Sequence, residues 1–93
     1  TLDVENIQFY TKENKNLVCK MDVINKSHAS ITLGAQFKDR ERNKADSKRL
    51  GRVSGNSRET FEVEINNFND GDDIVYIELY NTQKGIFINK KIK

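Results

Sequence analysis

The chain has 93 residues with a formal net charge of +2; 35% of the residues are hydrophobic and 32% are charged. A chain of this length has room for one hydrophobic core, so we expect residues 1–93 to form a single domain. The longest apolar runs are well short of the roughly 18 residues that cross a bilayer, so we expect a soluble domain without membrane insertion of this segment. The single cysteine excludes an internal disulfide framework.

The N-terminal half alternates apolar and polar residues, which predicts strands rather than helices. In 2–9, Leu2 and Val4 share one phase while Ile7 and Phe9 share the other, so we expect a bulge or a strand switch between them. The next two runs, 17–24 and 29–38, keep one phase throughout. Their inward faces are expected to carry Leu17, Cys19, Met21 and Val23, and then Ala29, Ile31, Leu33, Ala35 and Phe37.

The C-terminal half repeats the pattern. The run 59–65 places Phe61, Val63 and Ile65 on one face. The run 73–80 is more continuously apolar, with Val75, Ile77 and Leu79 on one face and Ile74, Tyr76 and Tyr80 on the other, which favours a central strand covered on both sides. The last run, 85–93, has Ile86, Ile88 and Ile92 in one phase and reads as a closing strand.

Turn-forming clusters separate these runs at 13–16, 25–28, 53–58, 69–73 and 81–85. Turns at intervals of roughly ten residues are typical of a sandwich or a small barrel, and no segment has the apolar stripe of an amphipathic helix. The expected fold is therefore all-β: an antiparallel, immunoglobulin-like β-sandwich of about seven strands, with almost no helix.

The middle of the chain resembles the small bacterial immunoglobulin-like sandwich domains of the FxLYD type. The similarity lies in Asn25 after "MDVI", in "FKD" at 37–39, and in the turn "SGN" at 54–56 that precedes the strand containing Phe61. The chain departs from that pattern at Lys38, where an aromatic residue is often found. The resemblance implies an extracytoplasmic location, secreted or on a bacterial cell surface, and no known catalytic residues.

The residue types that enzymes use are scarce. Cys19 falls at a core position, and His28, the only histidine, lies in the polar stretch "NKSHAS", so a Cys–His pair would join a core residue to a turn. The chain has no glycine-rich phosphate loop and no zinc-binding spacing. We therefore expect a protein that is not an enzyme, with no catalytic residues, no cofactor and no metal.

The segment "NFNDGDD", 67–73, is the one candidate for a metal, because it gathers Asn67, Asn69, Asp70, Asp72 and Asp73 around a glycine. It does not fit the spacing of an EF-hand loop. Asn and Asp next to Gly are also what a tight turn requires, and we favour that interpretation, with calcium-dependent adhesion as an alternative.

The most charged run, 37–55, is the candidate partner-binding region. If it forms a hairpin turning at "NKAD", 43–46, its first arm puts Lys38, Arg40 and Arg42 on one face. The predicted partner-binding residues are Lys38, Arg40, Arg42, Lys44, Lys48, Arg49 and Arg52. A solvated connection between strands would have the same composition.

These features favour a non-enzymatic protein-interaction or adhesion module of an extracytoplasmic or cell-surface assembly, whose partner is another protein. The alternative is a basic hairpin that binds a polyanion, either nucleic acid or an anionic cell-wall polymer. No aromatic residues interleave with the cations, which argues against nucleic acid. Self-association through strand edges is a further alternative.

Overall fold

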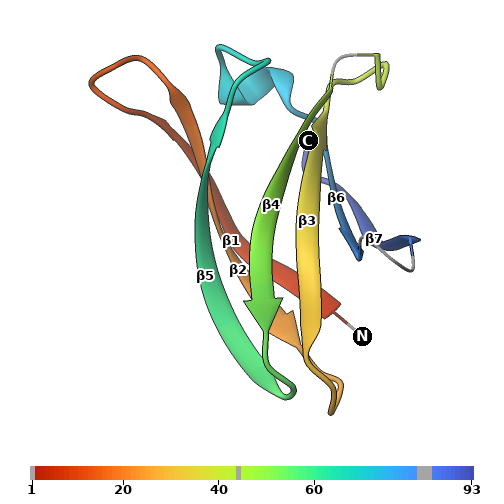
Figure 1. The fold of residues 1–93 in the computed structure, drawn as a ribbon. Helices are drawn as coiled ribbons and strands as arrows, with labels where there is room; N and C mark the ends of the chain where they lie inside the picture. The colour runs from red at the N-terminus through yellow and green to blue at the C-terminus, as the bar shows by residue number, and fades with distance from the viewer. Residues whose placement is uncertain (1, 44, 82–84) are drawn as a thin grey trace.

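The computed structural model describes residues 2–43, 45–81 and 85–93. These residues form seven strands and one turn of 3-10 helix (Figure 1). The strands are β1 (Leu2–Thr11), β2 (Leu17–Asn25), β3 (Ile31–Lys38), β4 (Ala45–Val53), β5 (Ser57–Ile65), β6 (Tyr76–Asn81) and β7 (Gly85–Lys91), and the 3-10 turn is η1 (Gly71–Asp73). The expected all-β class and strand number are confirmed.

The strands form two antiparallel sheets, one with the order β1-β2-β5 and the other with the order β4-β3-β6-β7. This connectivity is immunoglobulin-like, except that the fourth strand pairs with the third instead of joining the first sheet. Strands β4 and β5 are therefore the edges of different sheets and contact each other along one side of the sandwich (Figure 1).

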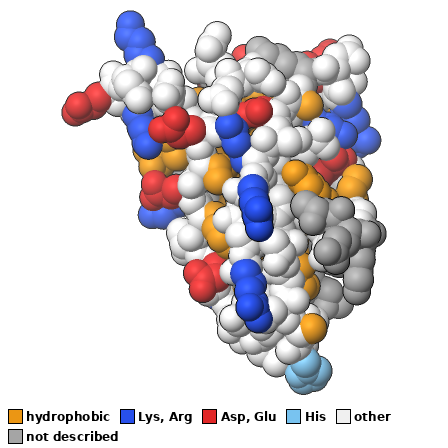
Figure 2. Space-filling view, viewed as in Figure 1, with side chains coloured by type: hydrophobic (Ala, Val, Ile, Leu, Met, Phe, Trp, Pro, Cys, Tyr) orange, Lys and Arg blue, Asp and Glu red, His pale blue; other side chains and the backbone are white. Residues whose placement is uncertain are grey.

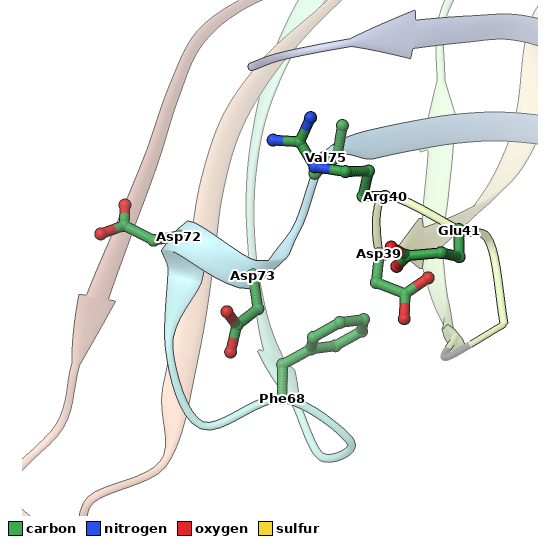
Figure 3. A pocket seen from close by; sticks show the side chains of 7 residues that line it. All are labelled: Asp39, Arg40, Glu41, Phe68, Asp72, Asp73 and Val75. Carbon is green, nitrogen blue, oxygen red and sulfur yellow. The ribbon is translucent and has the colours of Figure 1, made fainter.

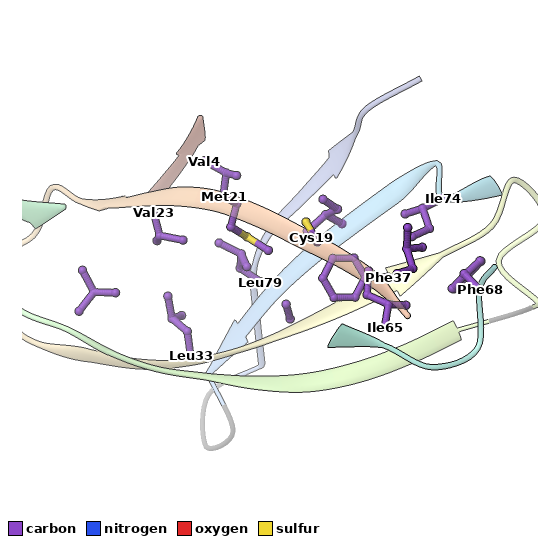
Figure 4. Packing of buried hydrophobic residues seen from close by; sticks show 14 residues of the cluster. Val4, Cys19, Met21, Val23, Leu33, Phe37, Ile65, Phe68, Ile74 and Leu79 are labelled. Carbon is purple, nitrogen blue, oxygen red and sulfur yellow. The ribbon is translucent and has the colours of Figure 1, made fainter. Parts of the chain in front are cut away.

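The core lies between the two sheets and is built from the alternating residues (Figure 4). All four inward residues expected in 17–24 are at most 3% exposed. Leu33, Ala35 and Phe37 have no exposed surface, whereas Ile31 is half-buried and Ala29 is exposed because it precedes the strand. Alternation thus identified most of the core.

The phase change expected near the N-terminus is present as a bulge. The register of β1 against β2 shifts between Glu5 and Gln8, and Asn6 has a left-handed φ of 55°. An extra residue in one strand reverses which side chains point inward, so both halves of β1 contribute to the core.

A second shift changes the last strand, where the prediction that Ile86, Ile88 and Ile92 share a face is wrong. Ile88 pairs with Leu79, but the register shifts before Tyr80, which pairs with Ile86. Ile88 and Ile92 pack against the core, whereas Ile86 lies on the outer side of the sheet and is 61% exposed.

Strand β6 is central in its sheet, as expected, but no second layer of strands covers its outer side in the described part of the chain. The outward residues of β6 are Tyr76, Glu78 and Tyr80, and only Glu78 is buried there. The outer face of this sheet is therefore a surface on which side chains alone shield the backbone.

Candidate functional site

The basic run forms the predicted hairpin, but its turn is earlier and longer than predicted. Strand β3 ends at Lys38 and β4 begins at Ala45, so Arg40 and Arg42 lie in the connecting loop. Strand alternation does not apply to a loop, so the expectation that Lys38, Arg40 and Arg42 line one face of a strand is wrong. Lys44 lies outside the described residues.

The other predicted cations are divided between two sides of the sheet. Strand pairing places Lys38, Arg49 and Arg52 on the outer side, opposite Tyr76, Gly34 and Thr32 respectively. Lys48 pairs with the inward Ala35 and lies at the sandwich edge, with its Nζ 3.9 Å from Asp46. Figure 2, which looks onto the side of β4 and β5, accordingly shows Lys and Arg side chains in several separate places.

Lys38 is joined to a buried carboxylate. Its Nζ lies 3.0 Å from Glu78 Oε1, and the two side chains are 20% and 4% exposed. The angles between the Lys38 ammonium and Glu78 Oε1 are not those of a hydrogen bond. Oε1 therefore has an ion-pair partner but no hydrogen-bond donor among the described residues. Removing one partner of such a pair is costly because it leaves a charge that is shielded from water without compensation.

The loop after β3 directs Arg42 onto an aromatic ring. Asp39 fixes the loop, because its Oδ1 accepts a hydrogen bond from Asn43 N at 2.9 Å and its carbonyl accepts one from Arg42 N at 3.1 Å. Arg42 adopts a left-handed φ of 62°, and its guanidinium lies 4.2 Å from the centre of the Tyr76 ring. The cation–π contact and the bonded loop hold Arg42 at one end of the sheet's outer face.

Two further outward residues add apolar surface. The ring of Tyr80 lies over Gly34, so close that a Cβ at residue 34 would lie 2.5 Å from Tyr80 Cζ. Ile86 is opposite Tyr80 on the next strand and remains exposed. We call the outer surface of this sheet the basic–aromatic face; it comprises Lys38, Arg42, Arg49, Arg52, Tyr76, Tyr80, Ile86 and Lys91.

The outer face of the β1-β2-β5 sheet has the opposite character, since its polar groups bond to one another across the strands. The pairs are Lys12 with Glu64 at 2.9 Å, Arg58 with Glu5, Tyr10 with Glu62 at 2.7 Å, and Asp22 with both Thr60 at 2.6 Å and Asn6 at 2.8 Å. Hydrogen bonds from Thr60 and Asn6 lower the pKa of Asp22, and the hydrogen bond from Lys12 lowers the pKa of Glu64. Most carboxylates of this face therefore have a partner on the same face.

The acidic segment 67–73 forms a turn. Asp70 caps η1, because its Oδ1 accepts a hydrogen bond from Asp72 N at 2.9 Å, while Asn67 Nδ2 donates to Ala45 O at 2.7 Å. Over residues 2–43, 45–81 and 85–93, no three His, Cys, Asp or Glu side chains come together as metal ligands. Asp70 thus caps a turn, and Asn67 ties the segment to β4, but the segment crosses from β5 in one sheet to β6 in the other and Gly71 does not have a positive φ, so the tight hairpin turn that was favoured is not what forms.

A hollow of about 360 Å³ lies between this turn and the loop after β3 (Figure 3). Its lining comprises Asp39, Arg40, Glu41, Phe68, Asp72, Asp73 and Val75. In Figure 3 the loop carrying Asp39 and Glu41 faces Asp73 and the Phe68 ring across the hollow, whereas Asp72 points away. Arg40 therefore lies among carboxylates and apart from the basic–aromatic face.

Cys19 and His28 lie in different environments. Cys19 has no exposed surface, and burial raises the pKa of its thiol to about 12, so it carries almost no thiolate at neutral pH. His28 is exposed in the turn after β2, with Nδ1 3.1 Å from Asn56 Nδ2. The thiol has the character of a core residue.

Comparison of the chain with models of known protein families gave no match, and comparison with curated proteins gave none either. Within the described residues, the structure contains no helix of the length and apolar character that membrane crossing demands.

Proposed function

We propose that this domain is a non-enzymatic protein-interaction module and that the basic–aromatic face is its docking surface. The partner is a protein whose contact surface combines acidic groups with an apolar area. Arginine and tyrosine are among the residue types that most often dominate binding energy in protein interfaces, and here Tyr80 pairs with the exposed Ile86 across β6 and β7.

The observation that carries this proposal is the contrast between the two outer faces. On the β1-β2-β5 sheet, carboxylates bond to cations, hydroxyls and amides of the same face. On the basic–aromatic face, strand pairing places Lys38, Arg49, Arg52 and Lys91 on the outer side, where Glu78, paired with Lys38, is the one carboxylate on the described strands, and Ile86 is exposed. A surface with excess charge of one sign and an exposed apolar side chain gains from a complementary partner.

The proposal places the domain in an extracytoplasmic or cell-surface assembly. The support for this location is the resemblance to FxLYD-type domains, carried by Asn25, the "FKD" at 37–39 and Gly55. Sandwich domains commonly serve as interaction modules, although a fold of this kind does not specify a partner.

Polyanion binding is the second candidate, favoured by the exposed Arg49 and Arg52 on β4 and by Arg42 at the end of the same face. The two candidates differ in whether Tyr80 and Ile86 contribute to binding. A polyanion is held by the cations through counterion release, whereas a protein partner also buries Tyr80 and Ile86.

The test is affinity capture from extract of the source cells at physiological salt, with three forms of the domain. The first variant, Tyr80→Ser/Ile86→Ser, removes the two apolar side chains; the second, Arg42→Ser/Arg49→Ser/Arg52→Ser, removes the three arginines. The matched control, Tyr10→Ser/Lys12→Ser, changes the other outer face. We expect both face variants to lose one specific protein that the wild type and the control retain.

Heparin and oligonucleotide columns separate the two candidates. Retention that disappears at physiological salt, depends on the three arginines and ignores Tyr80 and Ile86 would support the polyanion function. Loss of the captured protein from the control, with retention by both face variants, would move the docking surface to the other sheet.

A further inference from the structure

The open side of an edge strand presents a row of unpaired backbone N–H and C=O groups. The four edge strands of this sandwich differ in how well they can pair with another strand. In β1, the bulge at Asn6 interrupts the strand, Val4 N bonds to Asp3 Oδ1 at 2.8 Å, and Lys90 Nζ donates to Val4 O at 2.9 Å. Side-chain bonds and a bulge therefore block this edge.

The edges of the other sheet are also irregular. The register of β4 against β3 shifts beside Gly51, which has a φ of 137°, and Ala45 O at its start accepts the Asn67 side chain. Strand β7 carries the register shift that turns Ile86 outward. A bulge bends and twists an edge away from a flat partner.

Strand β5 is the regular edge. All nine of its residues, Ser57–Ile65, pair with β2 without a register shift. Along its outer edge, none of the bonds between described residues engages the backbone from Arg58 to Glu64. Strand β4 of the other sheet contacts β5 along this side of the sandwich but does not pair with it, so β5 remains the last strand of its own sheet (Figure 1).

The sequence of β5 is complementary to itself when a second copy runs antiparallel about its middle residue, Phe61. A two-fold axis there pairs the whole strand and places Arg58 opposite Glu64 of the second copy, and Thr60 opposite Glu62 of the second copy. Arg58, Thr60, Glu62 and Glu64 all lie on the outer side of the sheet, because they pair with Ile24, Asp22, Lys20 and Val18 of β2. The pair of Arg58 with Glu64 of the second copy occurs twice because of the two-fold symmetry.

We propose that this chain forms a two-fold symmetric dimer through antiparallel pairing of β5 with β5 of a second copy, which joins the two β1-β2-β5 sheets into one. Directly opposed charges of opposite sign stabilise such a pairing, and Phe61, which lies on the inner side of the sheet and packs against the core, is opposite its own copy at the axis. Arg58 and Glu64 are 49% and 41% exposed while paired with Glu5 and Lys12, so both can still reach the second copy.

The test is sedimentation velocity of the purified domain from about micromolar to several hundred micromolar, a range that covers weak association. The wild type is expected to show a concentration-dependent monomer–dimer equilibrium. Arg58→Glu alone and Glu64→Arg alone each set like charges opposite each other and should raise the dissociation constant about tenfold. The double variant Arg58→Glu/Glu64→Arg restores opposite charges at both pairs and should recover most of the affinity.

Two controls separate this effect from damage to the fold. Arg52→Glu makes the same charge change on the other sheet and should leave dimerisation unchanged. Glu5→Gln removes the charge of the internal partner of Arg58 without changing the proposed interface. Circular dichroism reports whether each variant is folded. A wild type that stays monomeric over the whole range, or a folded double variant that stays as weak as the single ones, overturns the proposal.

Discussion

The ring of Tyr80 occupies the space above Gly34 that any side chain at residue 34 would need, with Tyr80 Cζ 2.5 Å from the position of a Cβ. The two residues are paired across β3 and β6 on the outer face of the sheet. The absence of a side chain at Gly34 therefore determines where the aromatic ring of the basic–aromatic face rests.

Gly34→Ala should displace the Tyr80 ring, because the clash is with the far end of a side chain that can rotate. We expect a loss of about 1 kcal/mol in the free energy of unfolding, at the low end of overpacking costs. In a Tyr80→Ala background the same change should cost almost nothing, so denaturant unfolding of the four forms gives a double-mutant cycle. Equal costs in both backgrounds would contradict the contact.

Asn25 should be the most important polar side chain for stability. It has no exposed surface; its Nδ2 donates to the carbonyls of Ala29, Val53 and Ser54, at 2.8, 3.2 and 3.2 Å, and its Oδ1 accepts from Ser27. Asn25→Ala removes these hydrogen bonds from a fully buried site and should cost about 2 to 3 kcal/mol, or roughly 10 to 20 °C in Tm.

Asn89→Ala is the matched control for Asn25, because Asn89 is exposed on β7. Thermal unfolding of this variant should lie close to that of the wild type. Similar Tm values for both alanine variants would show that the Asn25 bonds contribute little.

The Lys38–Glu78 pair should respond asymmetrically to mutation. Lys38→Met leaves the Glu78 carboxylate, which is 4% exposed, without a cation and should cost about 3 kcal/mol or more. Glu78→Gln leaves the ammonium of Lys38, which is 20% exposed, able to reach water, and should cost about 1 kcal/mol. Urea unfolding at neutral pH checks the order, and a larger loss from Glu78→Gln would refute it.

Acid should weaken the β1-β2-β5 sheet through Asp22. Hydrogen bonds from Thr60 and Asn6 lower the pKa of Asp22 in the folded state. A lowered pKa stabilises the fold above the ordinary value of about 3.9, and this stabilisation is lost as the pH falls through the folded value. Between about pH 5 and pH 2, the free energy of unfolding should therefore fall less steeply with decreasing pH for Asp22→Asn than for the wild type. Identical slopes for the two forms would contradict this role of Asp22.

Local patterns predicted the strands and most of the core, because alternation depends only on neighbours in sequence. A bulge or a strand switch in β1 was predicted for the same reason, since Val4 and Ile7 are in opposite phases, and the structure has the bulge. Ile86 was assigned to the wrong face because its orientation depends on how β7 pairs with β6 after Tyr80. Pairing of distant strands is not visible in a local pattern.

The candidate site was predicted only in part, for a related reason. The sequence identified the cations but not the aromatic residues among them, because Tyr76 and Tyr80 are 34 or more positions away from Arg42 along the chain. The sequence does show Tyr76 and Tyr80 together on the second face of the run 73–80. That face was expected to be covered by another layer, so the two tyrosines were not assigned to a binding surface. Arg40 does not lie on the basic–aromatic face because β3 ends at Lys38 and Asp39 begins the loop, where it accepts hydrogen bonds from Arg42 N and Asn43 N.

The most direct test of the docking surface is site-specific photo-cross-linking in extract of the source cells. A photoactivatable aromatic residue replaces Tyr80 on the basic–aromatic face in one form of the domain and Tyr10 on the opposite face in another. We expect cross-linking of one defined protein from position 80 and none of it from position 10. The same protein cross-linked from position 10 alone would contradict the proposal that the basic–aromatic face is where this domain binds its partner.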